Sequence, residues 1–251
     1  RYMLTLLSRC AYCGRLILET SLAMHWLASI LLLALCSDVV HSKPLIPLSE
    51  PEGLNLLKRS NNLADYGYLI RAYITQANLA YCAVASSVMV MNSLAIPAPE
   101  VNGFRGYRFW TQENIFNHQS SADPFEPGRV RRQGMTLQEL AQFLQSHGVK
   151  VSRRHADTFN VASLRNLMNE SLGDPNDRLI VNYFRPGLKQ KGGGHFSPVA
   201  AYDKESDRVL ILDVARYRYP SVWVQLTDLL SAMQTPDYAS GSQRGLLLIK
   251  R

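Results

Sequence analysis

The sequence predicts an α+β protein with two lobes, a helical lobe followed by a lobe built on a β-sheet. Beyond residue 42, helical patterns dominate the first half of the chain and strand patterns dominate the second half. Helices and strands that occupy separate parts of a chain are typical of the α+β class. With 251 residues, of which 47% are hydrophobic and 19% charged, the chain is globular and can bury a sizeable core.

Residues 1–42 are predicted to be a leader segment. The run from Trp26 to Cys36 carries no charge, has the length of a signal-peptide core and is too short to span a bilayer comfortably. Val40 and Ser42 are the small residues that a cleavage site before Lys43 requires. We therefore expect export to the periplasm or another extracytoplasmic space, with a membrane-anchored form if the leader is retained. No stable membrane span is expected in the mature form.

The first half of the remaining chain contains two predicted helices and two irregular segments. Residues 43–62 are polar and dotted with prolines, so we expect an arm or linker. Residues 83–95 are apolar on nearly every side, which predicts a buried helix. Residues 101–132 are rich in aromatic, Asn, Gln and Pro residues without periodicity and predict an irregular, ordered surface. Residues 135–148 begin with a capping box and end at a glycine, which predicts a second helix.

The second half carries the strands. Residues 149–153 alternate like a strand, and residues 160–172 predict another helix. Further strands are expected at residues 178–184, 195–202, 208–212 and 245–250, with a short helix at residues 226–234. We place the helical lobe at about residues 63–160 and the sheet lobe at about residues 161–251, within one domain of residues 43–251.

The formal net charge is +7, and the basic residues are not clustered. A nucleic-acid-binding protein concentrates its positive charge on one face or stripe. The sequence therefore argues against a nucleic-acid partner, while a modest excess of positive charge suits small anions.

Cys82 is the one cysteine beyond the leader, since Cys10, Cys13 and Cys36 all lie within it. It lies where a loop becomes the buried helix, so the free N–H groups of the helix N-terminus would point at the sulfur. A nearby positive end of a helix lowers the pKa of a thiol from its ordinary value of about 8.5 and makes it nucleophilic. A lone cysteine is also commonly a small buried apolar side chain, so its position by itself leaves both interpretations open.

His195 and Asp213 complete a candidate catalytic set. His195 begins a predicted strand in the stretch KGGGHFSPVAAYD, and its preceding glycines, Gly194 among them, allow a backbone to pass close to a ligand. Asp213 ends the next predicted strand, so adjacent antiparallel strands would bring its carboxylate beside the imidazole. The order of cysteine at a helix start, histidine on a strand and carboxylate on the next is that of papain-like enzymes. The amide of Gln76 could donate to an oxyanion formed in such a site.

Several blocks of the sequence occur together in one known family. These are QANLAYCAVASSVMVMNSL, YRFWTQENIF, RQGMTLQEL, GGGHFSPVAAY, ILDVARYRYPSVWV and QRGLLLI. At these residues, from about Ala72 to Lys250, the sequence resembles the phytochelatin synthase family, in particular its short bacterial members. The resemblance implies a papain-like fold with the active-site cleft between a helical lobe and an antiparallel sheet lobe. Ala83 departs from the family, which usually has glycine after the nucleophile, and Ser221 replaces a proline.

The resemblance implies a glutathione γ-glutamylcysteinyltransferase. Cys82 would take the γ-glutamylcysteinyl group from glutathione, release glycine, and pass the group to a second glutathione or to water. His195 would be the general acid and base, Asp213 the orienting carboxylate and Gln76 the oxyanion donor. Asp237 and Arg244 would bind the γ-glutamyl end of the substrate, and Gly194 would be a further substrate-binding residue. Short forms would mainly hydrolyse glutathione.

The resemblance also sets expectations for metals and partners. No intrinsic cofactor or metal site is expected, because the sequence shows no ligand cluster. Cadmium or zinc would enter as a metal–glutathione thiolate substrate. A homodimer is the assembly considered for this chain. Two alternatives remain: a papain-like peptidase acting on other peptides, and a binding module for thiol peptides without turnover.

Overall fold

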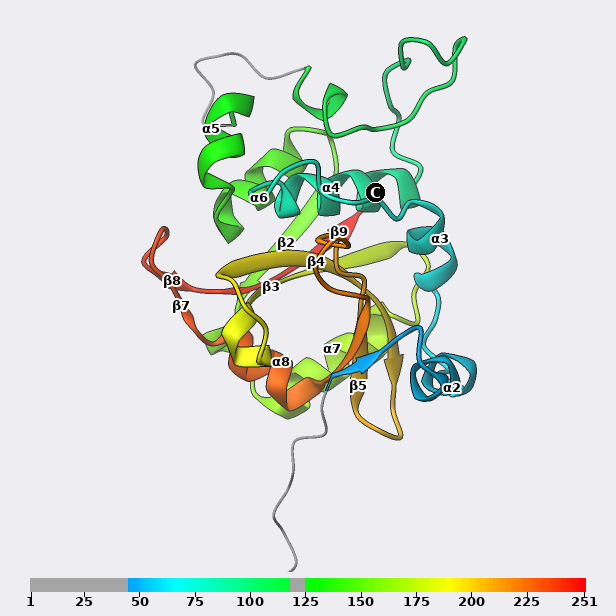
Figure 1. The fold of residues 1–251 in the computed structure, drawn as a ribbon, viewed down its shortest axis with the longest axis vertical. Coiled ribbons are helices and arrows are strands. Elements are labelled where there is room, and N and C mark those ends of the chain that lie inside the picture. The colour runs from blue at the N-terminus through cyan, green and yellow to red at the C-terminus, as the bar shows by residue number, and fades with distance from the viewer. Residues whose placement is uncertain (1–44, 118–124) are drawn as a thin grey trace, which may run out of the picture. The chain divides into compact units, whose positions relative to one another are not determined.

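A seven-stranded antiparallel sheet organises residues 45–117 and 125–251, the parts of the chain that the computed structural model describes (Figure 1). The strand order is β1-β6-β5-β4-β3-β9-β2. Its strands are β1 (Ile46–Pro47), β2 (Lys150–His155), β3 (Asp177–Phe184), β4 (Gly194–Asp203), β5 (Arg208–Ile211), β6 (Val222–Gln225) and β9 (Gly245–Lys250). A separate pair is formed by β7 (Pro236–Asp237) and β8 (Ser242–Gln243). The predicted α+β class is confirmed, and so are the strands expected in the second half.

Helices cover both faces of this sheet. They are α2 (Pro51–Arg59), α3 (Tyr66–Arg71), α4 (Cys82–Ser93), α5 (Pro127–Gln133), α6 (Leu137–Gln145), α7 (Val161–Ser171) and α8 (Leu226–Met233). Strand residues alternate between the faces: Ile180 packs in the cluster that contains α4 and α6, whereas Leu179 and Val181 pack in the cluster that contains α7 and α8. Figure 1 shows α4 and α6 on one side of the sheet and α7 and α8 on the other.

The prediction of an arm at residues 43–62 was wrong for the residues that the structure describes. This segment contributes the edge strand β1 and the helix α2, in which Gly53 and Leu56 are buried. The indole Nε1 of Trp223 donates to the carbonyl of Gly53 at 3.0 Å. Pro51 begins the helix, because proline at the first helical position lacks only an N–H group that would be unpaired there anyway. Pro47 and Pro51, which suggest a linker in the sequence, therefore lie in an edge strand and at the start of a helix.

The sheet extends beyond the segment predicted for it. Its two edge strands, β1 and β2, both precede residue 161 in the chain. Of the segment expected to be irregular, residues 127–133 form α5, and residues 118–124 lie outside the described part of the chain.

Helix α4 is the buried centre of the layer that carries Cys82. Ten of its twelve residues are buried, as the apolar pattern predicts, and the helix packs on the central strand β4. Because α4 is apolar on all sides, it cannot expose a face to water and its N-terminus is held in place by packing.

No helix among residues 45–117 and 125–251 is long and apolar enough to cross a membrane. The predicted leader and its cleavage site before Lys43 lie outside the described residues.

Candidate active site

Cys82 is the first residue of α4 and is partly buried. The residue before it, Tyr81, makes no side-chain cap to the helix, so the first N–H groups of α4 have no capping side chain at this end. The backbone N–H groups of Ala83 and Phe196 donate to the sulfur. The local sequence thus places a thiol at the positive end of a buried helix, as predicted.

His195 faces Cys82 from β4, the strand on which α4 packs. Its side chain is buried against the ring of Tyr183 on β3, edge to face, at 5.6 Å between ring centres. The Nε2 atom lies 3.0 Å from Oδ1 of Asp213 and 3.0 Å from the hydroxyl of Ser197. This leaves Nδ1 for the hydrogen bond between the imidazole and the Cys82 side chain.

Asp213 is fully buried two residues after β5 and is held by several donors. Arg185 makes a two-pronged ion pair with it, at 2.9 Å and 3.0 Å, and the backbone N–H of Ala215 donates at 2.9 Å. These bonds fix the carboxylate while Oδ1 also accepts from His195. The structure therefore brings Cys82, His195 and Asp213 into one hydrogen-bonded series.

The pKa values of the three groups are coupled through this series. Desolvation opposes ionisation of Cys82, but the hydrogen bond and charge of His195, with the backbone N–H groups, lower the pKa of Cys82 below its ordinary value. Desolvation also disfavours a charged imidazole, yet bonds to Asp213 and Cys82 raise the pKa of His195. Burial alone would raise the pKa of Asp213, and the bonds and charges of His195 and Arg185 instead lower it to about 2. The set favours a thiolate beside an imidazolium, which is the reactive form of such a pair.

An open pocket of about 420 Å³ adjoins the thiol. Cys82, Gly194, Asp237 and Arg244 all line it, although they come from α4, β4, β7 and the residue before β9. Only the resemblance to the family places Gly194, Asp237 and Arg244 in the same site as Cys82. The structure brings all four residues to one pocket.

Arg244 presents one edge of its guanidinium for a ligand. Nη1 is held by the carbonyls of Thr235 and Pro236, whereas Nε is buried without a partner among the described residues. A methyl group on Gly194 would lie 3.0 Å from Nη2 and 3.2 Å from Nε, so the glycine leaves room for that edge. Nη2 lies 3.9 Å from a carboxylate oxygen of Asp237. The Nε–Nη2 edge, on which, among the described residues, Nε has no partner and Nη2 faces only the carboxylate of Asp237, is the fork with which arginine binds a carboxylate.

Gln76 is buried, but its amide is already in use. The NH₂ group donates to the carbonyl of Asn78 at 2.7 Å and to the hydroxyl of Tyr217 at 3.3 Å, while Oε1 has no partner among the described residues. An amide has two N–H groups, so donation to an oxyanion would require the release of one of these bonds.

Ala83 does not line the pocket. Its side chain is fully buried in the core. The methyl group that replaces the family's glycine hydrogen therefore packs in the core and not along the pocket beside the sulfur.

Two residues of the site were missed in the sequence. Arg185, directly after β3, looks like an ordinary surface arginine until its contact with Asp213 is seen. Asn182 lies within β3, lines the pocket, and its buried Oδ1 has no partner among the described residues. A polar residue inside an otherwise apolar strand, RLIVNYF, was the available signal for Asn182.

Fold and site together define a class: an α+β protein in which a thiol at a helix N-terminus, a histidine and a buried carboxylate form one hydrogen-bonded series beside an open pocket. The sequence model of the phytochelatin synthase family matches residues 37–246. The chain belongs to the phytochelatin synthase family.

Relatives come from plants and from a yeast. The chain is 34% identical over 216 residues to glutathione gamma-glutamylcysteinyltransferase 3 of Lotus japonicus, which covers 85% of this chain and 44% of the relative. It is 32% identical over 216 residues to glutathione gamma-glutamylcysteinyltransferase 1 of Triticum aestivum, covering 85% and 42%. The corresponding protein of Schizosaccharomyces pombe is 27% identical over 193 residues, covering 76% and 45%. The chain thus spans less than half the length of these curated relatives.

Proposed function

We propose that the protein is a short glutathione γ-glutamylcysteinyltransferase that forms a thioester on Cys82 and passes the acyl group to water or to a second glutathione. The observation that carries this proposal is that Cys82, hydrogen-bonded to His195, shares its pocket with Arg244, whose Nε has no partner among the described residues. The names of its relatives supply the substrate class.

In the proposed acylation the triad supplies the nucleophile and the proton transfers. The thiolate of Cys82 attacks the carbonyl carbon between cysteine and glycine of glutathione, and the C–N bond breaks as the imidazolium of His195 gives its proton to the leaving amine. Asp213 keeps the ring oriented and stabilises its positive charge. The developing oxyanion is expected to accept from backbone N–H groups at the start of α4, with Gln76 as a further donor once its amide turns.

The deacylation reverses the proton transfer. Neutral His195 accepts a proton from water or from the amine of a second glutathione as that molecule attacks the thioester carbonyl. The C–S bond then breaks and restores the Cys82 thiolate. Attack by water gives γ-glutamylcysteine, and attack by the amine lengthens the peptide. We propose that hydrolysis is the main outcome, as the resemblance to short family members implies.

Substrate binding is proposed to depend on the two charged groups at the α-carbon of the γ-glutamyl group. The Nε–Nη2 edge of Arg244 suits the α-carboxylate, and Asp237 suits the α-ammonium group. The unpartnered Oδ1 of Asn182 is a second acceptor in the same pocket, because a buried carbonyl oxygen gains a hydrogen bond when a donor arrives.

Metal is proposed to act only as part of the substrate. Residues 45–117 and 125–251 contain no group of three or more His, Cys, Asp or Glu side chains that could hold a metal ion. Cadmium or zinc would then arrive as a glutathione thiolate complex. Export of the chain is proposed from the leader segment of its sequence. A homodimer is proposed as its assembly.

The test is mass spectrometry of the full chain incubated with glutathione, with and without cadmium, beside Cys82→Ala. We expect a γ-glutamylcysteinyl adduct and free glycine from the wild type and neither from the variant. The ratio of dipeptide to longer peptides measures hydrolysis against transfer.

A second substrate separates this activity from a general peptidase. Acetylation of the glutathione α-amine removes the charge proposed to bind Asp237, so cleavage should fall by about tenfold or more. Equal cleavage of both substrates would instead favour a peptidase that ignores the γ-glutamyl end. An unmodified Cys82 and intact glutathione after prolonged incubation would favour a binding module.

A further inference from the structure

A tyrosine that does not line the pocket contacts two parts of the candidate active site. Tyr219 lies in the connection between β5 and β6, shortly after Asp213, and is partly exposed. Its backbone N–H donates to the carbonyl of Ala215 at 3.1 Å, and the N–H of Ala215 donates to the carboxylate of Asp213. One turn of the chain therefore fixes both the triad carboxylate and Tyr219.

The ring of Tyr219 lies against the guanidinium that holds Asp213. The guanidinium carbon of Arg185 is 4.6 Å from the centre of this ring. Arg185 is only 4% exposed, and beside its ion pair with Asp213 it donates to the side chain of Gln190 at 2.6 Å. A cation over an aromatic face is attracted to it, and the attraction is stronger where water is excluded. The ring therefore helps to keep Arg185 on the carboxylate.

The hydroxyl of Tyr219 holds the backbone that leads into His195. It accepts from the N–H of Lys191 at 2.7 Å and donates to the carbonyl of the same residue at 3.1 Å. Lys191 precedes three glycines, of which the last is Gly194. A methyl group added to Gly194 would lie 3.0 Å from Nη2 of Arg244, so this backbone runs close to the guanidinium. Because glycines are conformationally free, such a stretch needs a contact from outside to fix it.

We propose that Tyr219 is a positioning residue for the reaction at Cys82, with two separable contributions. Its ring keeps Arg185 on the triad carboxylate, and its hydroxyl keeps the glycine stretch against Arg244. The kinetic part of this proposal rests on the proposed function. The reactivity of the thiol and the motion of the glycine stretch can be measured without any glutathione turnover.

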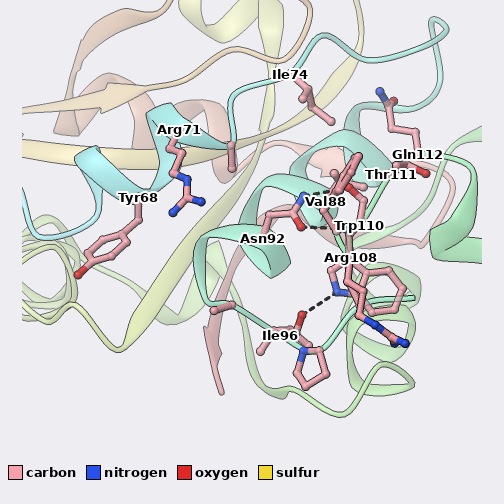
Figure 2. Close-up of a pocket in the computed structure, with 15 residues that line it drawn as sticks. Tyr68, Arg71, Ile74, Val88, Asn92, Ile96, Arg108, Trp110, Thr111 and Gln112 are labelled. Atoms are coloured by element: carbon pink, nitrogen blue, oxygen red, sulfur yellow. Dashed lines mark hydrogen bonds between the residues drawn. The ribbon is translucent and has the colours of Figure 1, made fainter. Parts of the chain in front are cut away.

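A second tyrosine provides a matched control, because it makes the same kind of contact in another part of the fold. The ring centre of Tyr68, in α3, lies 5.0 Å from the guanidinium carbon of Arg178, and Arg178 forms a buried ion pair with Asp65. Figure 2 shows Tyr68 at a hollow of about 810 Å³ that none of the three triad residues lines. Substitutions of Tyr68 therefore report the loss of such a contact on the fold alone.

The ring is tested by the reaction of iodoacetamide with Cys82 at pH 6 in the full chain, followed by the mass of the peptide that contains this cysteine. Tyr219→Phe keeps the ring and should react within about twofold of the wild type. Tyr219→Leu loses the ring and should react about three- to tenfold more slowly, because Arg185 then holds the triad carboxylate less firmly. Tyr68→Leu should react like the wild type.

The hydroxyl is tested by hydrogen exchange and by glycine release from glutathione. In Tyr219→Phe, the amides of residues 191–194 should exchange faster than in the wild type, because the bonds to Lys191 are lost. The KM should rise about three- to tenfold with kcat within about twofold, since binding is loosened and the triad is still held. Tyr219→Leu should add a fall in kcat of about three- to tenfold. Tyr68→Phe and Tyr68→Leu should change neither constant.

Thermal midpoints separate a positioning role from a structural one. Tyr68→Leu and Tyr219→Leu each lose one ring from a buried arginine, so their midpoints should fall by similar amounts. Slower alkylation in Tyr219→Leu alone then assigns the effect to the site. If Tyr219→Leu is unfolded at the assay temperature, Tyr219→Met removes the ring with an unbranched side chain and takes its place.

The proposal is overturned by a wild-type alkylation rate in Tyr219→Leu, by equally slow alkylation in Tyr219→Phe, or by an equal loss in Tyr68→Leu. Unchanged exchange of residues 191–194 in Tyr219→Phe overturns the role of the hydroxyl. A wild type that leaves glutathione intact contradicts the proposed function alone, because the alkylation and exchange rates still decide the role of Tyr219.

Discussion

The reactivity of Cys82 depends on single side-chain contacts. The sulfur accepts hydrogen bonds from two backbone N–H groups and is hydrogen-bonded to His195. His195 is in turn hydrogen-bonded to Asp213. Each contact favours the charged form of its neighbour, so the thiolate and the imidazolium stabilise each other in a partly desolvated place. The helix N-terminus supplies only part of this effect.

Alkylation by iodoacetamide should reveal this coupling. The pKa of Cys82 is lowered and that of His195 is raised, so each charged group favours the other and a larger share of the thiol is ionised below its ordinary pKa. At pH 6 the wild type should react at least about tenfold faster than His195→Gln, in which the thiol keeps its desolvation but loses the imidazolium. The rate is followed by the mass of the modified chain. Equal rates at pH 6 that both rise only near pH 8.5 would contradict the coupled pair.

The glycine before His195 is expected to control substrate affinity. In Gly194→Ala the new methyl group would meet the guanidinium of Arg244 at 3.0 Å and displace it. The KM for glutathione should rise about tenfold while kcat stays within about threefold, because a binding contact is lost and the triad is untouched. Gly193→Ala is the matched control, since nothing lies within 4 Å of its added methyl group. A similar change in both variants would mean that loop flexibility, and not Arg244, is responsible.

At the scale of elements, a buried ion pair joins α3, α4 and β3. Arg178 at the start of β3 donates to Asp65 beside α3 at 2.8 Å and to the hydroxyl of Ser93 in α4 at 3.0 Å. Arg178 and Asp65 are 1% and 0% exposed. The pair therefore fixes the helical layer against the central sheet at the end of α4 away from Cys82.

A double-mutant cycle should show that the two charges act as a pair. Asp65→Leu alone leaves the buried Arg178 guanidinium unpaired and should lower the free energy of unfolding by about 3–5 kcal/mol. Arg178→Met alone should lower it by less, because burial raises the pKa of Asp65 to about 8 and the carboxyl without its partner keeps its proton. The double variant should be less destabilised than the sum, because neither charge then remains. Urea unfolding measures both values. Additive losses would indicate that the two residues contribute separately.

At the scale of the whole molecule, the triad carboxylate is part of the stability of the fold. Arg185 follows β3, His195 begins β4 and Asp213 follows β5, so the buried carboxylate links three neighbouring strands. Its ionised form is stabilised in the folded chain and solvated in the unfolded chain. The free energy of unfolding must therefore depend on pH through this group.

The sign of that dependence follows from the lowered pKa of Asp213, which is about 2 in the folded protein against an ordinary value of 3.8. The contribution is present above the ordinary value and is lost as the pH falls through the folded value. It amounts to about 2 kcal/mol between pH 4 and pH 2. Urea unfolding of the wild type and Asp213→Asn over this range should show the difference between them shrink by that amount. A difference that stays constant would mean that Asp213 does not titrate as described.

The sequence by itself determined the central helix, the central strands and the order of the triad. Helix α4, the strands β3, β4, β5 and β9, and the positions of Cys82, His195 and Asp213 at their ends follow from apolar periodicity and from capping and glycine signals. These signals are local, because helices and strands repeat over a few residues and their ends need particular residues. The pocket residues Asp237 and Arg244 were reached only through resemblance.

Only the tertiary structure decided which charges are buried and what they contact. Arg185, Asn182 and Arg178 look like unremarkable polar residues until the sheet brings them against Asp213, the pocket and Asp65. The packed helix α2 was likewise hidden, because Pro51 at its start resembles a linker proline when only the sequence is seen. Burial and charge pairing arise from contacts between residues far apart in the chain, and such contacts leave no period in the sequence.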